Sequence, residues 1–411
     1  MVKGPESQNQ YDIIVVGAGM VGASLACLLA KDSQGYASGP LRIALVEARP
    51  APRFNPDQFD PRVAAITEKS RQLLACCGVW DAVASKRVSP YQAMEVWDAE
   101  GTGRIQFDCH DIHQPSLGHI VENAVLVESL MTEIADLDNI DLHCPAVITG
   151  YETNEQGISI LLEDGTPLSA QLLLAADGAN SAIRKHFEFE TVEWDYGHQA
   201  IVSTIATERS NQQTAWQRFM PTGPLALLPL NNQGDLKRCS IVWSQETAEA
   251  ERLINLSDKQ FCAELSRASE HCLGQVLEVD KRFAIPLRQR HAKDYVIHRL
   301  ALIGDAAHSI HPLAGQGVNL GFADVQVLAE EIGRAVERGL DLGDLSVLKR
   351  YQRRRKPENL ATMAAMEGFK RLFAADPLAV RLLRNIGMST LNQISPVKNQ
   401  LMKAAMGLST N

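Results

Sequence analysis

Residues 10–47, QYDIIVVGAGMVGASLACLLAKDSQGYASGPLRIALVE, determine how this 411-residue chain folds. They begin with a β-branched run at residues 11–16, which favours a buried parallel strand over a helix. A glycine-rich turn follows at once, and residues 23–31 then continue as a helix. A second apolar strand spans residues 41–46. Strand, turn, helix and strand in this order predict an α/β fold built on a parallel sheet.

The glycine-rich turn has the spacing G-x-G-x-x-G, formed by Gly17, Gly19 and Gly22. The first glycine permits a tight turn, the second lets the backbone approach a pyrophosphate, and the third lets the helix pack on the sheet. The helix N-terminus adds free N–H groups and a partial positive charge. The second strand ends on Glu47, whose carboxylate can accept hydrogen bonds from a ribose diol. We therefore expect a dinucleotide here rather than a glycine turn without a ligand.

Composition excludes several classes of protein. The net charge is −9 and we find no nucleic-acid recognition motif, so we expect no nucleic-acid partner. Eight cysteines without C-x-x-C spacing indicate a reducing compartment and no metal site. No apolar run approaches the ~18 residues of a membrane span. With 45% hydrophobic residues, we expect two closely packed domains in a cytoplasmic protein, for which a peripheral contact with the inner membrane stays open.

Residues 63–85 are predicted to form one helix with Arg62 at its start. An arginine in that position would contact either a cofactor phosphate or ribose, or a local carboxylate, and the sequence favours neither. Residues 94–98 and 104–108 alternate like two antiparallel strands.

A second candidate site follows the apolar strand at residues 172–176. This strand delivers Asp177 to its carboxyl end, where open α/β sheets bind ligands, and Gly178 permits a close turn. The alternative is an Asx turn in which Asp177 caps a short helix. The presence of the first site favours a ligand.

A third candidate site follows the apolar strand at residues 300–303. Gly304 and Asp305 come next, so Asp305 leaves a strand end, where its carboxylate can bond a sugar or ribityl hydroxyl. Three glycines follow where a second helix begins: Gly315, Gly317 and Gly321. Without side chains, they leave backbone N–H groups accessible to a pyrophosphate or a flavin edge. Three separate stretches are thus predicted to converge on one extended ligand.

Two histidines lie in this third stretch, His308 and His311. Their ordinary pKa near neutrality would suit proton transfer. The alternative, which is the more common role in such a turn, is a hydrogen bond to the backbone.

Residues 190–293 have a different character, with polar, strand-like alternation followed by a helical piece at residues 258–269. We expect an antiparallel sheet inserted into the nucleotide domain, where it covers the ligand and holds the substrate. The predicted organisation is a nucleotide domain in two parts, residues 1–189 and 294–362, an inserted substrate domain at 190–293, and a helical C-terminal region at 363–411.

The C-terminal region has a local excess of basic residues. From residue 363 onward six basic side chains face two acidic ones, a net charge of +4: Lys370, Arg371, Arg381, Arg384, Lys398 and Lys403 against Glu367 and Asp376. Leucines recur at near-helical spacing around Arg381 and Arg384. This pattern suits a helix lying in a membrane interface, and it suits equally a helix packed on its own core or on a partner subunit.

The three sites together resemble the fingerprints of class A flavoprotein aromatic hydroxylases. The motifs are G-A-G-M-V-G from Gly17 with Glu47, D-G-A-N-S-A-I-R from Asp177, and G-D-A-A-H from Gly304. Within that family, H-P-L-A-G-Q-G-V-N-L-G from His311, G-H-I-V-E-N from Gly118 and M-E-V-W-D from Met94 resemble the ubiquinone-biosynthesis hydroxylases. W-D-Y from Trp194 and C-S-I-V-W-S from Cys239 are similar to the 2-polyprenylphenol hydroxylase branch.

The resemblance implies FAD as the cofactor. Gly17, Gly19, Gly22 and Glu47 would hold its ADP half, with Arg62 nearby. Asp177 and Gly178 would line the groove between cofactors, and Gly304 with Asp305 would bind the ribityl and pyrophosphate region. The residues expected to face the isoalloxazine are Pro312, Gly315, Gln316, Gly317, Val318 and Asn319.

The resemblance also implies oxygen chemistry. A flavin reduced by NAD(P)H or by a reductase reacts with O2 to give a C4a-hydroperoxyflavin, which transfers oxygen to an electron-rich phenol ring. Pro312, Gly315 and Gln316 would form the reactive wall of this site. The implied substrate is a polyprenylphenol, and a ubiquinone-biosynthesis protein complex and a homo-oligomer are further candidate partners.

Other functions remain open at the level of sequence. A nicotinamide dehydrogenase would use residues 17–47 but leave the sites at Asp177 and Asp305 idle, and a flavin halogenase lacks the expected W-x-W. A flavin-stabilised structural subunit of a biosynthetic assembly, or a hydroxylase of another aromatic substrate, would share every motif described above.

Overall fold

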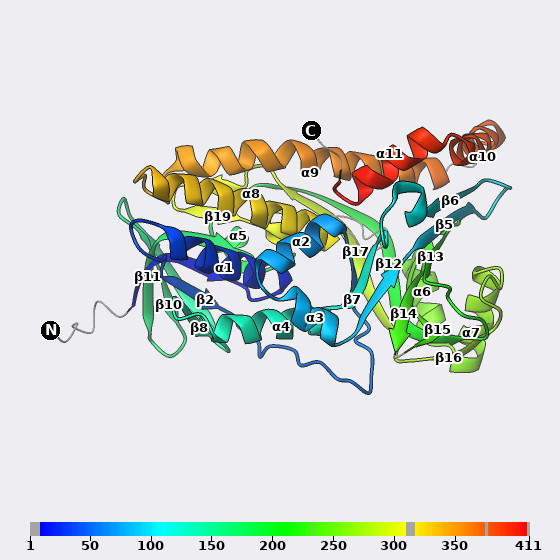
Figure 1. Cartoon of the computed structure of the whole chain (residues 1–411), viewed down its shortest axis with the longest axis horizontal. Coiled ribbons are helices and arrows are strands. Elements are labelled where there is room, and N and C mark those ends of the chain that lie inside the picture. The colour runs from blue at the N-terminus through cyan, green and yellow to red at the C-terminus, as the bar shows by residue number, and fades with distance from the viewer. Residues whose placement is uncertain (1–8, 233, 310–316, 375–376, 409–411) are drawn as a thin grey trace.

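The computed structural model describes residues 9–232, 234–309, 317–374 and 377–408. Two large sheets lie side by side, with a small three-stranded sheet between them and long helices along one side (Figure 1). The small sheet has the order β3-β7-β4, with β3 at Val63–Ile66, β7 at Gly118–Glu122 and β4 at Val88–Tyr91.

The first sheet has the strand order β18-β19-β11-β1-β2-β8, and β9 and β10 extend it from β11. The strands are β1 Gln10–Val16, β2 Ile43–Val46, β8 Ile140–His143, β9 Ile148–Thr153, β10 Ile158–Leu162, β11 Pro167–Ala175, β18 Val296–Ile297 and β19 Leu300–Leu302. The run from β19 through β11, β1 and β2 to β8 is parallel, which confirms the predicted α/β class.

The register of the parallel strands brings their carboxyl ends to one level. Val16 pairs with Val46 on one side and with Ala175 on the other. Ala175 in turn pairs with Leu302 of β19. The three predicted sites, which follow these strand ends, therefore lie along one edge of the sheet, where open α/β sheets bind their ligands.

Helices cover the first sheet. α1 packs between α4 and α8, and α9 packs on α8. The bounds are α1 Met20–Asp32, α4 Asn123–Ala135, α8 Gly317–Glu337 and α9 Leu345–Ala374, with the short helix α5 at Ala182–His186 and 3-10 turns η2 Ser33–Gly35 and η4 Gly304–Ala306. Every residue of α1 from Gly22 to Ala30 is buried, as expected for a helix enclosed on several sides.

The second sheet has the order β20-β17-β12-β15-β14-β13-β5-β6, with β16 paired to β12. The strands are β5 Ala93–Asp98, β6 Arg104–Asp108, β12 Thr191–Thr207, β13 Thr214–Phe219, β14 Leu225–Asn232, β15 Asp235–Glu246, β16 Val276–Val279, β17 Phe283–Ala292 and β20 His308–Ser309. Helices α6, Thr247–Ile254, and α7, Asp258–Ala268, pack on it. The predicted inserted antiparallel sheet is thus present.

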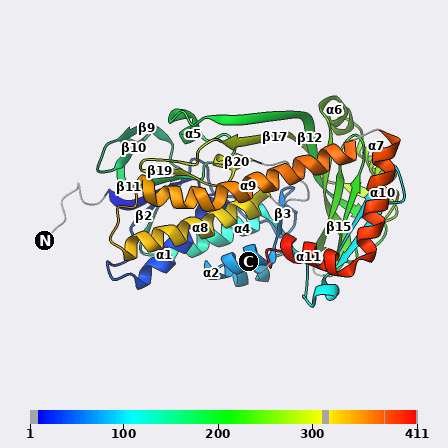
Figure 2. The ribbon, with the colours of Figure 1, turned by 90° about the horizontal axis from the view of Figure 1, so that it is seen from above.

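Two of the predicted domain boundaries need correction. The sheet assigned to residues 190–293 draws β5 and β6 from residues 93–108, because β5 pairs in parallel with β13. The boundary at residue 363 falls inside α9, which continues unbroken from Leu345 to Ala374 even though Pro357 lies within it. Figure 2 shows α9 running from the first sheet to the second.

The prediction of one helix over residues 63–85 was wrong. Residues 63–66 form β3, and two short helices follow, α2 at Glu68–Cys76 and α3 at Trp80–Ser85. Thr67 begins α2 as an N-cap, since its side chain accepts a hydrogen bond from the Ser70 N–H, and Gly78 interrupts the helical path with a φ of +78°. Arg62 consequently precedes a strand and not a helix.

The C-terminal helices α10, Leu378–Gln393, and α11, Ser395–Ala405, return across the second sheet toward its junction with the first (Figure 2). The side chain of Arg384 is buried and bonds both carboxylate oxygens of Asp98, at 2.7 and 2.9 Å. Arg381 pairs with Glu100 at 3.0 Å. Of the two alternatives left open for this region, Arg384 therefore fits a helix packed on the protein's own core and does not face a membrane. No helix within the described residues is long and apolar enough to cross a bilayer.

Candidate functional site

The glycine turn after β1 is shaped by three different steric demands. A Cβ on Gly17, whose φ is +98°, would lie 2.4 Å from the carbonyl oxygen of Ala176. A Cβ on Gly22 would lie 1.9 Å from the carbonyl oxygen of Gly17. At Gly19 a Cβ would meet nothing within 4 Å. Gly17 and Gly22 thus keep the turn compact, and Gly19 opens onto space at the N-terminus of α1.

Glu47 lies beside this turn, at the end of β2. One carboxylate oxygen accepts a hydrogen bond from the Ala18 N–H at 2.8 Å, and the other accepts one from the Arg49 N–H at 2.9 Å. Each oxygen keeps a second lone pair. The backbone therefore fixes the Glu47 carboxylate in place, and it can still accept hydrogen bonds from a ribose.

Asp177 follows β11, next to Gly17. Its Oδ2 accepts hydrogen bonds from the N–H groups of Ala182 and Ile183, at 2.8 and 3.3 Å. Asp177 thus caps the start of α5 as the alternative predicted, but through N–H groups five and six residues on and not through an Asx turn. Its Oδ1 is buried and has no partner among the described residues. Gly178 has a φ of +80°, and a Cβ there would meet nothing within 4 Å. Asp177 both caps the helix and leaves a buried acceptor unused.

The third stretch packs directly on the first. A Cβ on Gly321 would lie 2.6 Å from Cγ2 of Val21, and a Cβ on Gly304 would lie 3.2 Å from Cγ1 of the same valine. The V of G-A-G-M-V-G therefore packs against two glycines of the third fingerprint. This explains why α8 can approach α1 so closely.

Arg184 joins the second stretch to the third, a role that the sequence did not reveal. Its guanidinium is buried and donates hydrogen bonds to the carbonyl oxygens of Ala306, at 2.8 Å, and Ala179, at 2.7 Å. Burying a guanidinium group costs free energy unless its N–H groups donate hydrogen bonds. Because Arg184 donates to both loops, it links them to one another.

Asp305 lies at the end of β19 with its side chain exposed to solvent. Desolvation by the surrounding protein nevertheless raises the pKa of its carboxyl group. This position suits the predicted contact with a ribityl or pyrophosphate group.

A buried ionic network supports the turn that carries Asp305. Asp324 of α8 accepts hydrogen bonds from the Gly304 N–H at 3.0 Å and from Nε of Arg355 at 2.8 Å, and its Oδ2 lies 2.6 Å from Nε2 of His308. Burial alone would raise the pKa of Asp324, but His308 and Arg355 lower it to about 2. His308 is buried in this network and therefore positions the turn, whereas His311 lies outside the described residues.

Of the remaining predicted site residues, some are described by the structure and others lie outside the described residues. Arg62 is exposed, with Nε 3.9 Å from Asp60, so the local carboxylate is the partner seen here. Asn319 ties α8 to the segment around β3, since it donates to the Ala65 carbonyl at 2.8 Å and accepts from the Ser70 hydroxyl at 2.7 Å. Val318 is half-buried at the start of α8. Pro312, Gly315 and Gln316, the predicted flavin-facing wall, lie outside the described residues.

These features fit an extended dinucleotide such as FAD. A cradle at Gly19 that a Cβ would fill, a fixed ribose acceptor at Glu47 and an unused buried acceptor at Asp177 lie along one sheet edge. The exposed side chain of Asp305, which follows β19, continues that edge beyond β11. Candidate contacts come from all three stretches. A mononucleotide would therefore leave some of these contacts without a ligand group.

Comparison with known proteins gives the same result. A family model described as FAD binding domain matches residues 10–365. The ubiquinone biosynthesis monooxygenase COQ6 of Xenopus tropicalis is 35% identical over 96% of this chain and 93% of its own length. The 3-demethoxyubiquinol 3-hydroxylase of Escherichia coli strain K12 is 36% identical over 97% of this chain and 98% of its own length. In fold, p-nitrophenol 4-monooxygenase PnpA from Pseudomonas putida DLL-E4 covers 97% of the chain with a TM-score of 0.77 at 16% identity.

Fold, site and these matches define a class, the FAD-dependent monooxygenases with class A architecture. Within it, the chain belongs to the FAD binding domain family and to its ubiquinone-biosynthesis hydroxylases. The predicted cofactor, enzyme class and family are confirmed. A dehydrogenase and a halogenase are set aside.

Proposed function

We propose that this enzyme hydroxylates the aromatic ring of a polyprenylated ubiquinone precursor. Two relatives matched along nearly their whole length support the proposal, because both are named for ubiquinone biosynthesis or a ubiquinol precursor. The observation that carries it is the convergence of three fingerprints on one sheet edge, with Gly19 open for a pyrophosphate. The branch assignment, as a 2-polyprenylphenol hydroxylase, is part of the same proposal.

Different residues would bind the cofactor, support its site and orient the substrate. FAD, once reduced by NAD(P)H or by a reductase, supplies the activation of O2 and the transfer of one oxygen atom. Gly17, Gly19 and Glu47 would hold its ADP half, and Asp305 would position the ribityl and pyrophosphate region. The Asp324 network fixes the turn that carries Asp305, so this carboxylate would meet the cofactor from a fixed position. The predicted wall from Pro312 to Gln316 would orient the phenol and exclude water.

The test is oxygen incorporation by the purified protein. With a short-chain prenylated phenol, a reductant and 18O2, the product should carry one labelled oxygen on the ring. Gly19→Val protein, prepared in parallel, should form none. If the parent binds flavin and accepts electrons but yields only hydrogen peroxide, the alternative is favoured, a flavin-binding structural subunit of a biosynthetic assembly.

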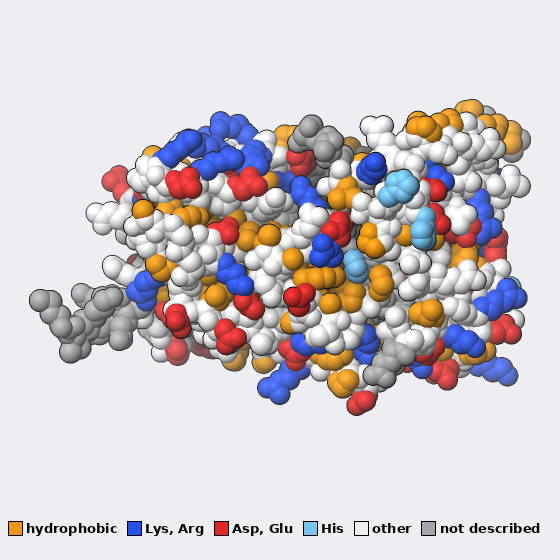
Figure 3. All heavy atoms as spheres, in the orientation of Figure 1, with side chains coloured by type: hydrophobic (Ala, Val, Ile, Leu, Met, Phe, Trp, Pro, Cys, Tyr) orange, Lys and Arg blue, Asp and Glu red, His pale blue; other side chains and the backbone are white. Residues whose placement is uncertain are grey.

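We further propose a peripheral membrane contact through the outer face of α10 and α11. Large apolar side chains stand exposed there, with Leu383 at 70% and Ile386 at 61% exposure. Figure 3 shows apolar side chains gathered over α10 at the upper right. The apolar face, and not Arg384, would make the contact, and this would bring a prenylated substrate within reach.

Vesicle binding tests this contact. Leu383→Ser with Ile386→Ser should reduce sedimentation with phospholipid vesicles several-fold and leave flavin content unchanged. Leu277→Ser serves as the control, because Leu277 of β16 is 60% exposed on the second sheet. Equal vesicle binding by the double variant and the parent would contradict the proposal and leave a protein partner or a second copy to cover this face.

A further inference from the structure

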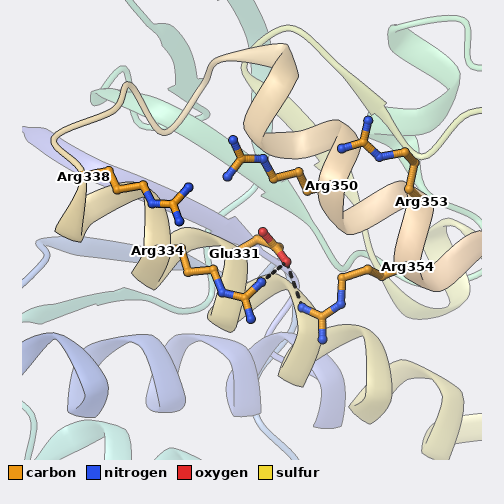
Figure 4. Close-up of a pocket in the computed structure, with 6 residues that line it drawn as sticks. All are labelled: Glu331, Arg334, Arg338, Arg350, Arg353 and Arg354. Carbon is orange, nitrogen blue, oxygen red and sulfur yellow. Dashed lines mark hydrogen bonds and ion pairs between the residues drawn. The ribbon is translucent and has the colours of Figure 1, made fainter. Parts of the chain in front are cut away.

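A basic recess of about 380 Å3 lies between α8 and α9, on the outer side of the helices that cover the first sheet. Figure 3 shows lysine and arginine side chains gathered over this region at the upper left. Its lining is five arginines around one glutamate, drawn in Figure 4: Glu331, Arg334, Arg338, Arg350, Arg353 and Arg354. No residue of the flavin site takes part.

Only two of the five arginines are neutralised within the recess. Oε1 of Glu331 accepts hydrogen bonds from Arg334 and Arg354, both at 2.8 Å, and these come from the two different helices (Figure 4). Glu330 adds a bond to Arg354 at 2.7 Å. The Glu331 side chain is 1% exposed, and its Oε2 is buried without a partner among the described residues. Glu331 thus fixes two guanidinium groups in orientation.

Three arginines, Arg338, Arg350 and Arg353, have no acidic partner in the part of the chain that the structure describes. Five arginines against Glu330 and Glu331 leave a net charge of +3 in the recess. The C-terminal end of α8 favours cations nearby, which accounts for Arg338. Arg350 and Arg353 follow the N-terminal, positive end of α9, so the helix dipole does not compensate them.

We propose that this recess binds the phosphate groups of an anionic ligand. Guanidinium groups bond phosphate oxygens in pairs, and here two are held in orientation while three supply uncompensated charge. The volume lies at the small end of the range for ligand pockets, about 300–1,000 Å3, so it suits a diphosphate or a phosphorylated head group. Free phosphorylated metabolites and anionic phospholipids present the same chemistry.

The test uses FAD-loaded protein, so that the flavin site is filled. Inorganic pyrophosphate is titrated by calorimetry in 150 mM KCl, and sedimentation compares phosphatidylglycerol with phosphatidylcholine vesicles. Arg350→Gln with Arg353→Gln should weaken binding of pyrophosphate, or of the anionic vesicles, by at least about tenfold. Neither arginine has an internal partner, so the melting temperature should stay unchanged.

The matched control is Lys259→Gln with Arg267→Gln, which removes two positive charges from the surface of α7. It should bind both probes as the parent does. Pyrophosphate binding that depends on Arg350 and Arg353 identifies a soluble ligand, and vesicle binding alone identifies a lipid. Absence of binding to both probes, or an equal loss in the control, would overturn the proposal.

Discussion

Gly19 differs from the other two glycines of the first fingerprint, because a Cβ at Gly19 alone would meet no protein atom within 4 Å. We predict that Gly19→Val folds but loses FAD, since the branched side chain would occupy the room that the pyrophosphate needs. Flavin absorbance per polypeptide after purification measures this, with circular dichroism as the check on folding. Gly35→Val is the control, because Gly35 is equally open but lies at the far end of α1. A folded Gly19→Val protein with normal flavin content would contradict the assignment.

Asp324 gives a prediction with a defined pH dependence. Its pKa is about 2 in the folded protein, below the value near 3.9 of an unfolded chain. The resulting stabilisation is therefore fully present above about pH 4 and is lost as the pH falls toward 2. Asp324→Asn should lower the free energy of unfolding by about 3 kcal/mol at pH 7, because Arg355 and His308 lose a buried partner.

Denaturant titrations at several pH values measure this difference. The gap between parent and Asp324→Asn should narrow by about 2 kcal/mol between pH 5 and pH 2. A gap that stays constant over that range would mean that Asp324 is not ionised in the folded protein.

At the scale of elements, α10 contacts the β5–β6 hairpin through several hydrogen bonds and through the buried ion pair of Arg384 with Asp98. Arg384→Gln should destabilise the protein by about 3 kcal/mol, because it leaves the buried Asp98 carboxylate without its cation. Limited proteolysis should then cleave within α10 and α11 earlier, while flavin content stays normal. Arg381→Gln is the comparison, since its pair with Glu100 is partly exposed and should contribute less than about 1 kcal/mol. Similar proteolysis of the two variants would contradict this view of α10.

The same elements show how far sequence reasoning reaches. The strands ending at Val16, Val46 and Ala175 were predictable, because apolar runs followed by glycine or an acid mark strand ends in a parallel sheet. The orientation of Arg384 was not predictable, since its partner lies 286 residues earlier and an amphipathic helix looks the same whether it faces lipid or protein. The network of Asp324, His308 and Arg355 likewise exists only once α8 and α9 have packed.

For the molecule as a whole, we expect FAD binding to stabilise the folded protein. It would contact three stretches that the chain brings together from residues 17–47, 177–178 and 304–305. Saturating FAD should therefore stabilise the apoprotein by about 4 kcal/mol at a thousandfold excess over Kd. Thermal unfolding with and without added FAD measures this. The melting temperature of Gly19→Val should not respond to FAD, and an equal response in both proteins would indicate binding elsewhere.

The position of β19 has a consequence for synthesis. This strand is made after every strand of the second sheet except β20, yet it lies beside β11, and the turn that follows it completes the third fingerprint. On the ribosome, a nascent chain that has not yet exposed Leu300 to Gly321 holds two of the three nucleotide-binding stretches and an uncovered edge at β11. We therefore expect cofactor loading late in the synthesis of each molecule. Until then the part of the β11 edge that β19 later covers, Leu173 to Ala175, is open to pairing with a neighbouring chain.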